Sequence, residues 1–104
     1  MNTSITKTKA GWQGNTRVDL GNDLVLRITT MRGVVLGGVG TDAIVHRIER
    51  VHGYAMEKYT RHDYHKRVIQ WDSRATEKNV RSQHQLALDM LDQIKAEIEQ
   101  HYAK

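Results

Sequence analysis

The sequence predicts an α+β fold, in which an antiparallel β-meander of four to five strands is followed by one long C-terminal amphipathic helix packed on the sheet. Two observations support it. Between residues 17 and 71, short apolar stretches with a period of two alternate with Gly, Asn, Asp and His turns. From about residue 75 to residue 100 there is no proline or glycine, and good helix formers dominate. We expect one domain over 17–104, preceded by a flexible N-terminal arm over 1–16, which is polar and lacks apolar periodicity.

The first predicted element is a hairpin within the stretch RVDLGNDLVLRITT. Leu20 to Asp23 contains the residue types that tolerate positive φ in a tight turn, and the apolar residues alternate after it. The next segment, 33–40, contains four glycines around the run Val34–Leu36. It lacks the lysine and serine or threonine of a phosphate-binding loop, so we expect a bulged connection between strands.

Residues 43–60 are ambiguous between a helix and a hairpin. Apolar residues recur at three- or four-residue spacing, but Gly53 interrupts the pattern and the residue types favour strands. We favour a hairpin with strands over 43–50 and 54–60, and the strand count depends on this choice. Residues 64–71 form the next predicted strand, with Tyr64 and Lys66 on one face and His65 and Arg67 on the other.

The C-terminal helix is predicted to start after a cap at Asp72 or Ser73 and to carry a wide apolar stripe. The stripe is formed by Val80, His84, Ala87, Leu91, Ile94 and Ile98, and it is widened by Leu86, Leu88 and Met90. Its arc spans about 200°, twice what a helix on one sheet usually needs. We therefore expect a homodimer with Leu86, Met90 and Ile94 at the contact.

Composition limits the functional classes. The chain has no cysteine, which excludes disulfides and thiolate zinc sites, and we expect a cytoplasmic protein without a membrane span. The net charge is +4. Residues 1–71 contain 11 Lys and Arg against 6 Asp and Glu, whereas residues 72–104 contain 5 against 6. This asymmetry indicates a polyanionic partner.

The richest stretch, YTRHDYHKRV, interleaves cations with aromatic rings. Cationic groups bind phosphates and flat rings stack on unpaired bases, so the sequence predicts a non-enzymatic nucleic-acid-binding face, with single strands among its ligands. The expected site residues are Arg47, Lys58, Tyr59, Arg61, Tyr64, Lys66 and Arg67. The predicted order of strands and helix is similar in outline to the single-stranded-DNA-binding modules of the Whirly and PUR kind, in which two sheet-plus-helix units pair; the likeness covers element order over residues 17–101.

Two alternatives stay open. The chain could be a protein-interaction module, such as an accessory or inhibitor protein of a phage or mobile element, that uses the wide helix face or the glycine-rich segment. It could also be a metal-assisted enzyme that uses the pair His62 and His65, although a metal site needs further ligands and no known spacing supplies them. No complete catalytic motif is present and no cofactor is expected.

Overall fold

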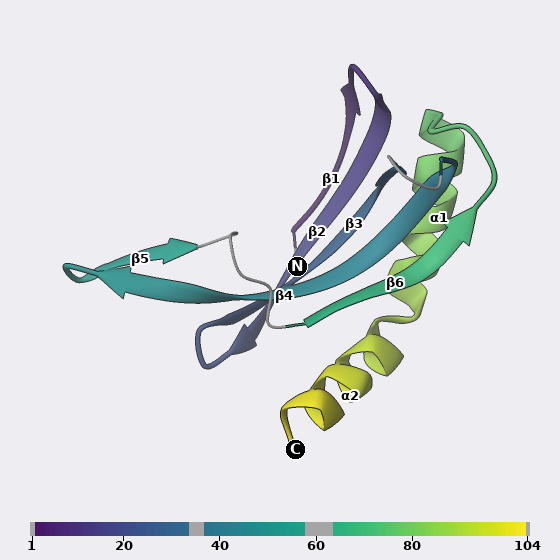
Figure 1. The fold of residues 1–104 in the computed structure, drawn as a ribbon. Coiled ribbons are helices and arrows are strands. Elements are labelled where there is room, and N and C mark those ends of the chain that lie inside the picture. The colour runs from purple at the N-terminus through teal and green to yellow at the C-terminus, as the bar shows by residue number, and fades with distance from the viewer. Residues whose placement is uncertain (1, 34–36, 58–63, 104) are drawn as a thin grey trace.

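The computed structural model describes residues 2–33, 37–57 and 64–103, and it confirms the α+β class (Figure 1). The strands are β1 (Asn2–Thr8), β2 (Gly11–Gly21), β3 (Leu24–Arg32), β4 (Val39–Val51), β5 (Tyr54–Glu57) and β6 (Tyr64–Trp71). The helices are α1 (Glu77–Asp89) and α2 (Leu91–Tyr102). Among the described residues, five strands form an antiparallel sheet in the order β1-β2-β3-β4-β6, and β5 pairs with the far end of β4.

The predicted N-terminal arm is instead a strand and the start of a second one. β1 pairs with β2 along its whole length, from Asn2 opposite Arg17 to Thr8 opposite Gly11. The segment NTSITKT is rich in β-branched residues, which favour strands. The alternation of buried and exposed residues is absent because β1 is an edge strand in which Ile5 alone is half-buried.

Both predicted hairpins are confirmed within the described residues. Asn22 and Asp23 have φ of 55° and 60° at the turn between β2 and β3. His52 and Gly53, with φ of 52° and 83°, form the turn between β4 and β5, so residues 43–51 are strand and His52 belongs to the turn, and none of them is helix. Residues 58–60 of the second predicted hairpin lie outside the described residues.

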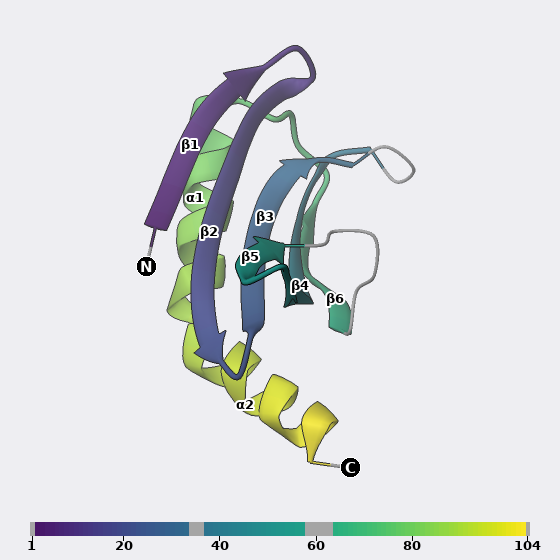
Figure 2. The ribbon, with the colours of Figure 1, turned by 90° about the vertical axis from the view of Figure 1, so that its left-hand side faces the viewer.

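β4 is long enough to pair with two strands along the same edge. Residues 39–45 pair with β6, and residues 48–51 pair with β5. The β4–β5 hairpin therefore extends beyond the sheet, and Figure 2 shows it projecting from the face opposite the helices. β6 has the predicted bounds, but a register shift opposite Thr41 and Asp42 changes its two faces. As a result Val68 and Ile69 both pack against the core, although strict alternation would separate them.

The prediction of a single long helix is wrong, because the helix is interrupted at Met90 and divides into α1 and α2 (Figure 1). Met90 has φ of −93° and ψ of 6°, and its N–H donates to the carbonyl of Ala87 at 3.1 Å. The predicted cap is also wrong, since the Thr76 hydroxyl accepts from the Asn79 N–H at 3.2 Å. The break redirects α2, which lets Ile94 and Ile98 continue the buried stripe of α1.

One face of the sheet packs on the helices to form the apolar core. Its buried members are Val18, Leu26, Ile28, Ala43 and Val45 from the strands and Ala87, Ile94 and Ile98 from the helices. These confirm most of the predicted helix stripe. Met90 and Leu91 pack against the same core.

A chain of polar side chains crosses the interface between α1 and the sheet. The His84 ring lies within 2.7 Å of the Thr16 hydroxyl through Nε2 and within 2.8 Å of the Thr30 hydroxyl through Nδ1. The Thr30 and Thr41 hydroxyls are 2.7 Å apart, and Thr41 donates to Gln83 Oε1 at 2.8 Å. All five side chains are buried. Position 14 favours glycine, because a Cβ there would lie only 3.0 Å from the His84 ring.

The direction of every hydrogen bond in this network follows from one carbonyl group. Gln83 Nε2 donates to the Val39 carbonyl at 3.0 Å, so its Oε1 must accept the Thr41 proton. Thr30 then donates to Thr41, which obliges His84 Nδ1 to carry a proton and donate to Thr30. Nε2 is left as an acceptor for Thr16. The network is fully satisfied with a neutral imidazole, which is what a buried site favours.

Candidate nucleic-acid interface

The described residues of the predicted interface divide between the two faces of the sheet. Tyr64 and Lys66 lie on the helix side of β6. Lys66 Nζ donates to Glu97 Oε2 at 2.6 Å, and this hydrogen bond raises the pKa of Lys66. The Tyr64 ring packs edge-on against the His101 ring, with centroids 5.2 Å apart. Both side chains are therefore engaged by α2.

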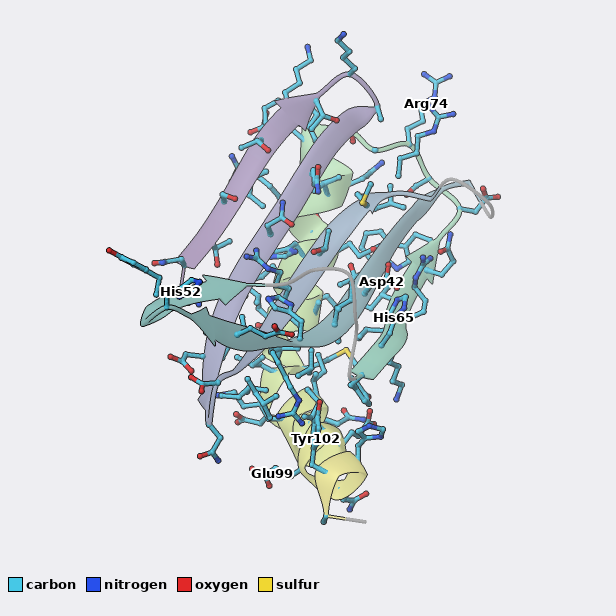
Figure 3. The ribbon with its side chains drawn as sticks, turned by 60° about the vertical axis from the view of Figure 1, so that its left-hand side comes forward. Asp42, His52, His65, Arg74, Glu99 and Tyr102 are labelled. Atoms are coloured by element: carbon cyan, nitrogen blue, oxygen red, sulfur yellow. The ribbon has the colours of Figure 1, made fainter. Side chains whose placement is uncertain are left out.

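The opposite face of β6 carries a cluster around the Asp42 carboxylate (Figure 3). Arg67 Nε donates to Asp42 Oδ1 at 2.7 Å, and His65 Nε2 lies 3.2 Å from the same oxygen. Arg67 also hydrogen-bonds to Gln70 Oε1, and its guanidinium occupies the space that a Cβ on Gly40 would fill. Asp42, at the opposite register position on β4, thus neutralises Arg67.

The remaining predicted residues lie apart from this cluster or outside the described ranges. Arg47 is exposed near the far end of β4, opposite Leu24. Lys58, Tyr59, Arg61 and His62 lie outside the described residues. The predicted pair of His62 and His65 therefore stays a prediction, and the described part of the chain holds no group of three His, Asp or Glu side chains that could bind a metal ion.

The predicted dimer contacts also differ in their surroundings. Leu86 is 44% exposed on α1, where it lines a surface groove together with Thr3 and Ile5 of β1. Met90 is half-buried against the core, and Ile94 is a core residue with 4% exposure. Ile94 is therefore not accessible to a second chain, and Leu86 is the exposed member of the three.

A different group of cations gathers where the β1–β2 turn, the end of β3 and the start of α1 meet. We call it the basic end, and it consists of Lys7, Lys9, Arg32, Arg74 and Lys78. All five side chains are exposed, and none forms an ion pair or side-chain hydrogen bond in the described structure. The acidic side chains of the same region are Asp72 and Glu77, and Glu77 is paired with Arg81 at 2.9 Å. The region is therefore strongly positive.

Local contacts hold the segments of the basic end together. The Trp12 N–H donates to the Ala75 carbonyl at 2.8 Å, which fixes the start of β2 against the segment before α1. A surface cavity of about 540 Å³ lies between these segments. Arg32 and Arg74 both line it, together with Ala10, Gly11, Gly37, Gly38, Ser73, Ala75 and Thr76. Two guanidinium groups therefore border one solvent-accessible depression.

Charges of both signs lie at the other end of the molecule. Figure 3 shows Arg74 at one end and Glu99 of α2 at the opposite end. α2 also carries Asp92, Lys95 and Glu97, and Glu97 is paired with Lys66 of β6. The nearby β2–β3 turn carries Asp23, beside Arg47 opposite Leu24. This end therefore has mixed charge, whereas the basic end is predominantly positive and would attract an approaching polyanion.

No family model matches this chain, and neither the comparison with known proteins nor that with solved structures gives a match. In the described ranges, no helix has the length and apolar character needed to cross a membrane. The candidate interface therefore rests on the geometry and charge of the chain itself.

Proposed function

We propose that this chain is a small, non-enzymatic nucleic-acid-associated protein that binds phosphates at its basic end. The observation that carries the proposal is the group of five exposed and unpaired cations defined above. Phosphate neutralisation supplies most of the affinity of sequence-independent nucleic-acid binding, and it requires cations that are not already paired with carboxylates. Lys7, Arg32 and Arg74 meet that condition, whereas Lys66 and Arg67 are held by Glu97 and Asp42.

The spacing of these cations also suits a phosphate backbone. They come from three separate segments that converge around one cavity, so several phosphates of a strand can be contacted at once. The opposite end carries charges of both signs, and its cation Lys66 is paired with Glu97, so it is less suited to a phosphate backbone. Tyr64 is packed against His101, so base stacking by this ring is not part of the proposal.

The test is a titration of a labelled single-stranded oligonucleotide at several salt concentrations, followed by fluorescence anisotropy. We expect binding at low salt that weakens steeply as salt rises. Arg32→Ala/Arg74→Ala should weaken binding and reduce the slope of log K against log salt by about 0.7 for each phosphate that the protein no longer neutralises. The matched control is Lys66→Ala/Arg67→Ala, which also removes two positive charges and should change the slope of log K against log salt less.

Two results would reject the proposal. One is the absence of binding at low salt. The other is an equal loss of affinity in both double variants, because such a result would mean that net charge alone, and not the basic end, governs the interaction.

A further inference from the structure

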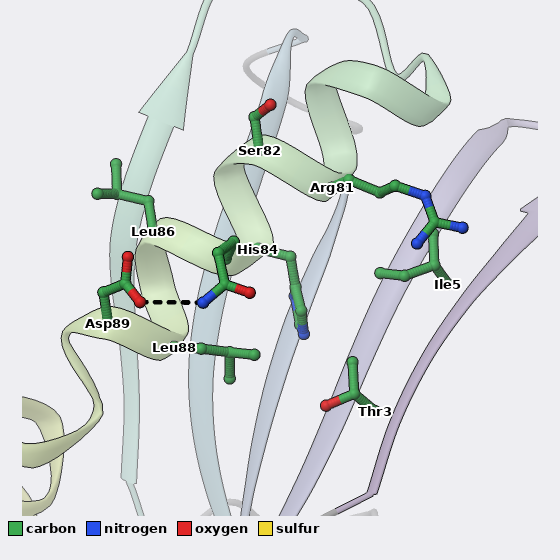
Figure 4. A pocket seen from close by; sticks show the side chains of 9 residues that line it. Thr3, Ile5, Arg81, Ser82, His84, Leu86, Leu88 and Asp89 are labelled. Atoms are coloured by element: carbon green, nitrogen blue, oxygen red, sulfur yellow. Dashed lines mark hydrogen bonds between the residues drawn. The ribbon is translucent and has the colours of Figure 1, made fainter.

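The β1 strand exposes an open sheet edge beside an unfilled groove. Among the described strands β1 pairs with β2 alone. Next to it a groove of about 710 Å³ separates β1 from α1 (Figure 4). Its walls include Thr3 and Ile5 from β1 and Leu88 and Asp89 from α1. Open edges with free N–H and C=O groups pair readily with another strand.

We propose that a second copy of this chain covers this edge, by antiparallel pairing of β1 with its twofold-related β1 centred on Ile5. This register pairs every residue of the strand, from Asn2 opposite Thr8 of the second copy to Ile5 opposite itself. It would join the two sheets into one continuous sheet and would be an isologous contact, as closed dimers require.

The side chains of β1 fit this register. Ile5, the half-buried residue of the strand, meets its own copy and forms an apolar pair at the axis. Thr3 meets Lys7, so the two lysines are kept apart and no like charges face each other within the strand pair. Centring the axis on Thr6 would instead leave Asn2 and Thr3 unpaired and bring both Lys7 side chains toward the axis.

Charge complementarity supports the second copy as the occupant. In this register Lys7 of the second copy lies opposite Thr3, which lines the same groove as Asp89, the carboxylate among the groove residues. Arg81 is the cation of the groove, and Figure 4 shows it extending toward Ile5. It is already neutralised by Glu77 at 2.9 Å, so it does not oppose the approach.

The oligomeric state is tested first by light scattering coupled to gel filtration. We expect the wild-type chain to be a dimer at micromolar concentration and Ile5→Asp to be a monomer, since two carboxylates would meet at the axis. Circular dichroism checks that the variant is folded. A monomeric wild-type chain would overturn the proposal, as would a dimer that Ile5→Asp, folded, leaves intact.

Cysteine cross-linking tests the register independently, because the chain has no cysteine of its own. Ile5→Cys should form a disulfide-linked dimer under mild oxidation, whereas Tyr54→Cys, exposed on the β4–β5 hairpin and not among the groove residues, should do so far more slowly. Thr3→Cys and Lys7→Cys should cross-link with each other when mixed and not when oxidised separately. Equal rates for the residue 5 and residue 54 variants would contradict the proposal.

Discussion

The buried hydroxyl of Thr30 provides a quantitative test of the hydrogen-bond network. Thr30→Val is nearly isosteric and leaves no cavity, but it removes the acceptor of the His84 Nδ1–H at 2.8 Å and the donor to Thr41 at 2.7 Å. An unsatisfied buried donor costs about 1–3 kcal/mol, and the second missing hydrogen bond adds about 1 kcal/mol. We therefore expect the free energy of unfolding to fall by about 2–4 kcal/mol, a large part of the stability of a domain this size.

Urea unfolding followed by far-UV circular dichroism measures this loss, with an unchanged m-value as the sign that the folded state is otherwise intact. The matched control is Thr29→Val, one residue away on the same strand. Its hydroxyl donates to Asn15 at 3.1 Å on the other face of the sheet, where it is half-buried, so its removal should cost less than about 1 kcal/mol. Equal losses of stability for the two variants would refute the deduced network.

Three further predictions concern pH, backbone and core. Burial lowers the pKa of His84, so the imidazole binds a proton more readily in the unfolded chain than in the folded one. The contribution of His84 to the free energy of unfolding should therefore be constant above pH 6.5 and fall below it by at most about 1.4 kcal/mol per pH unit. His84→Gln should reduce this pH dependence in unfolding experiments between pH 5 and 7. Gly38→Ala should destabilise far more than Gly53→Ala in urea unfolding, because both have positive φ but only the Cβ at residue 38 would fall on a β6 carbonyl. Ile94→Ala should cost about 2–5 kcal/mol and Leu86→Ala less than about 0.5 kcal/mol, and a comparable cost for both would contradict the assignment of Ile94 to the core.

Local patterns were sufficient for most elements of the fold. The turn at Asn22 and Asp23, the hairpin turn at Gly53 and the bounds of β6 follow from short-range residue preferences. The break at Met90 does not, because Met90 and Leu91 are both good helix formers and the interruption depends on packing against the sheet. β1 was missed for a related reason, since an edge strand that is exposed on both faces shows no apolar alternation.

The candidate site depended more strongly on contacts between distant residues. The sequence predicts that Lys66 and Arg67 are available to a ligand. Their acidic partners Glu97 and Asp42 lie more than 20 residues away along the chain, so local patterns do not reveal the ion pairs. Conversely, Arg32 and Arg74 are far apart along the chain, and only the fold brings them to the border of one cavity. The segment NTSITKTKAGW does indicate part of the basic end. If it is read as a hairpin, its two lysines lie together at the turn instead of on a flexible arm.

The most direct test of the central claim is a nuclear magnetic resonance titration of the labelled protein with a short single-stranded oligonucleotide at low salt. We expect amide shift changes in the β1–β2 turn, at Arg32 and between Ser73 and Lys78, with little change in α2. Changes centred on residues 64–67, or no saturable change at all, would contradict it.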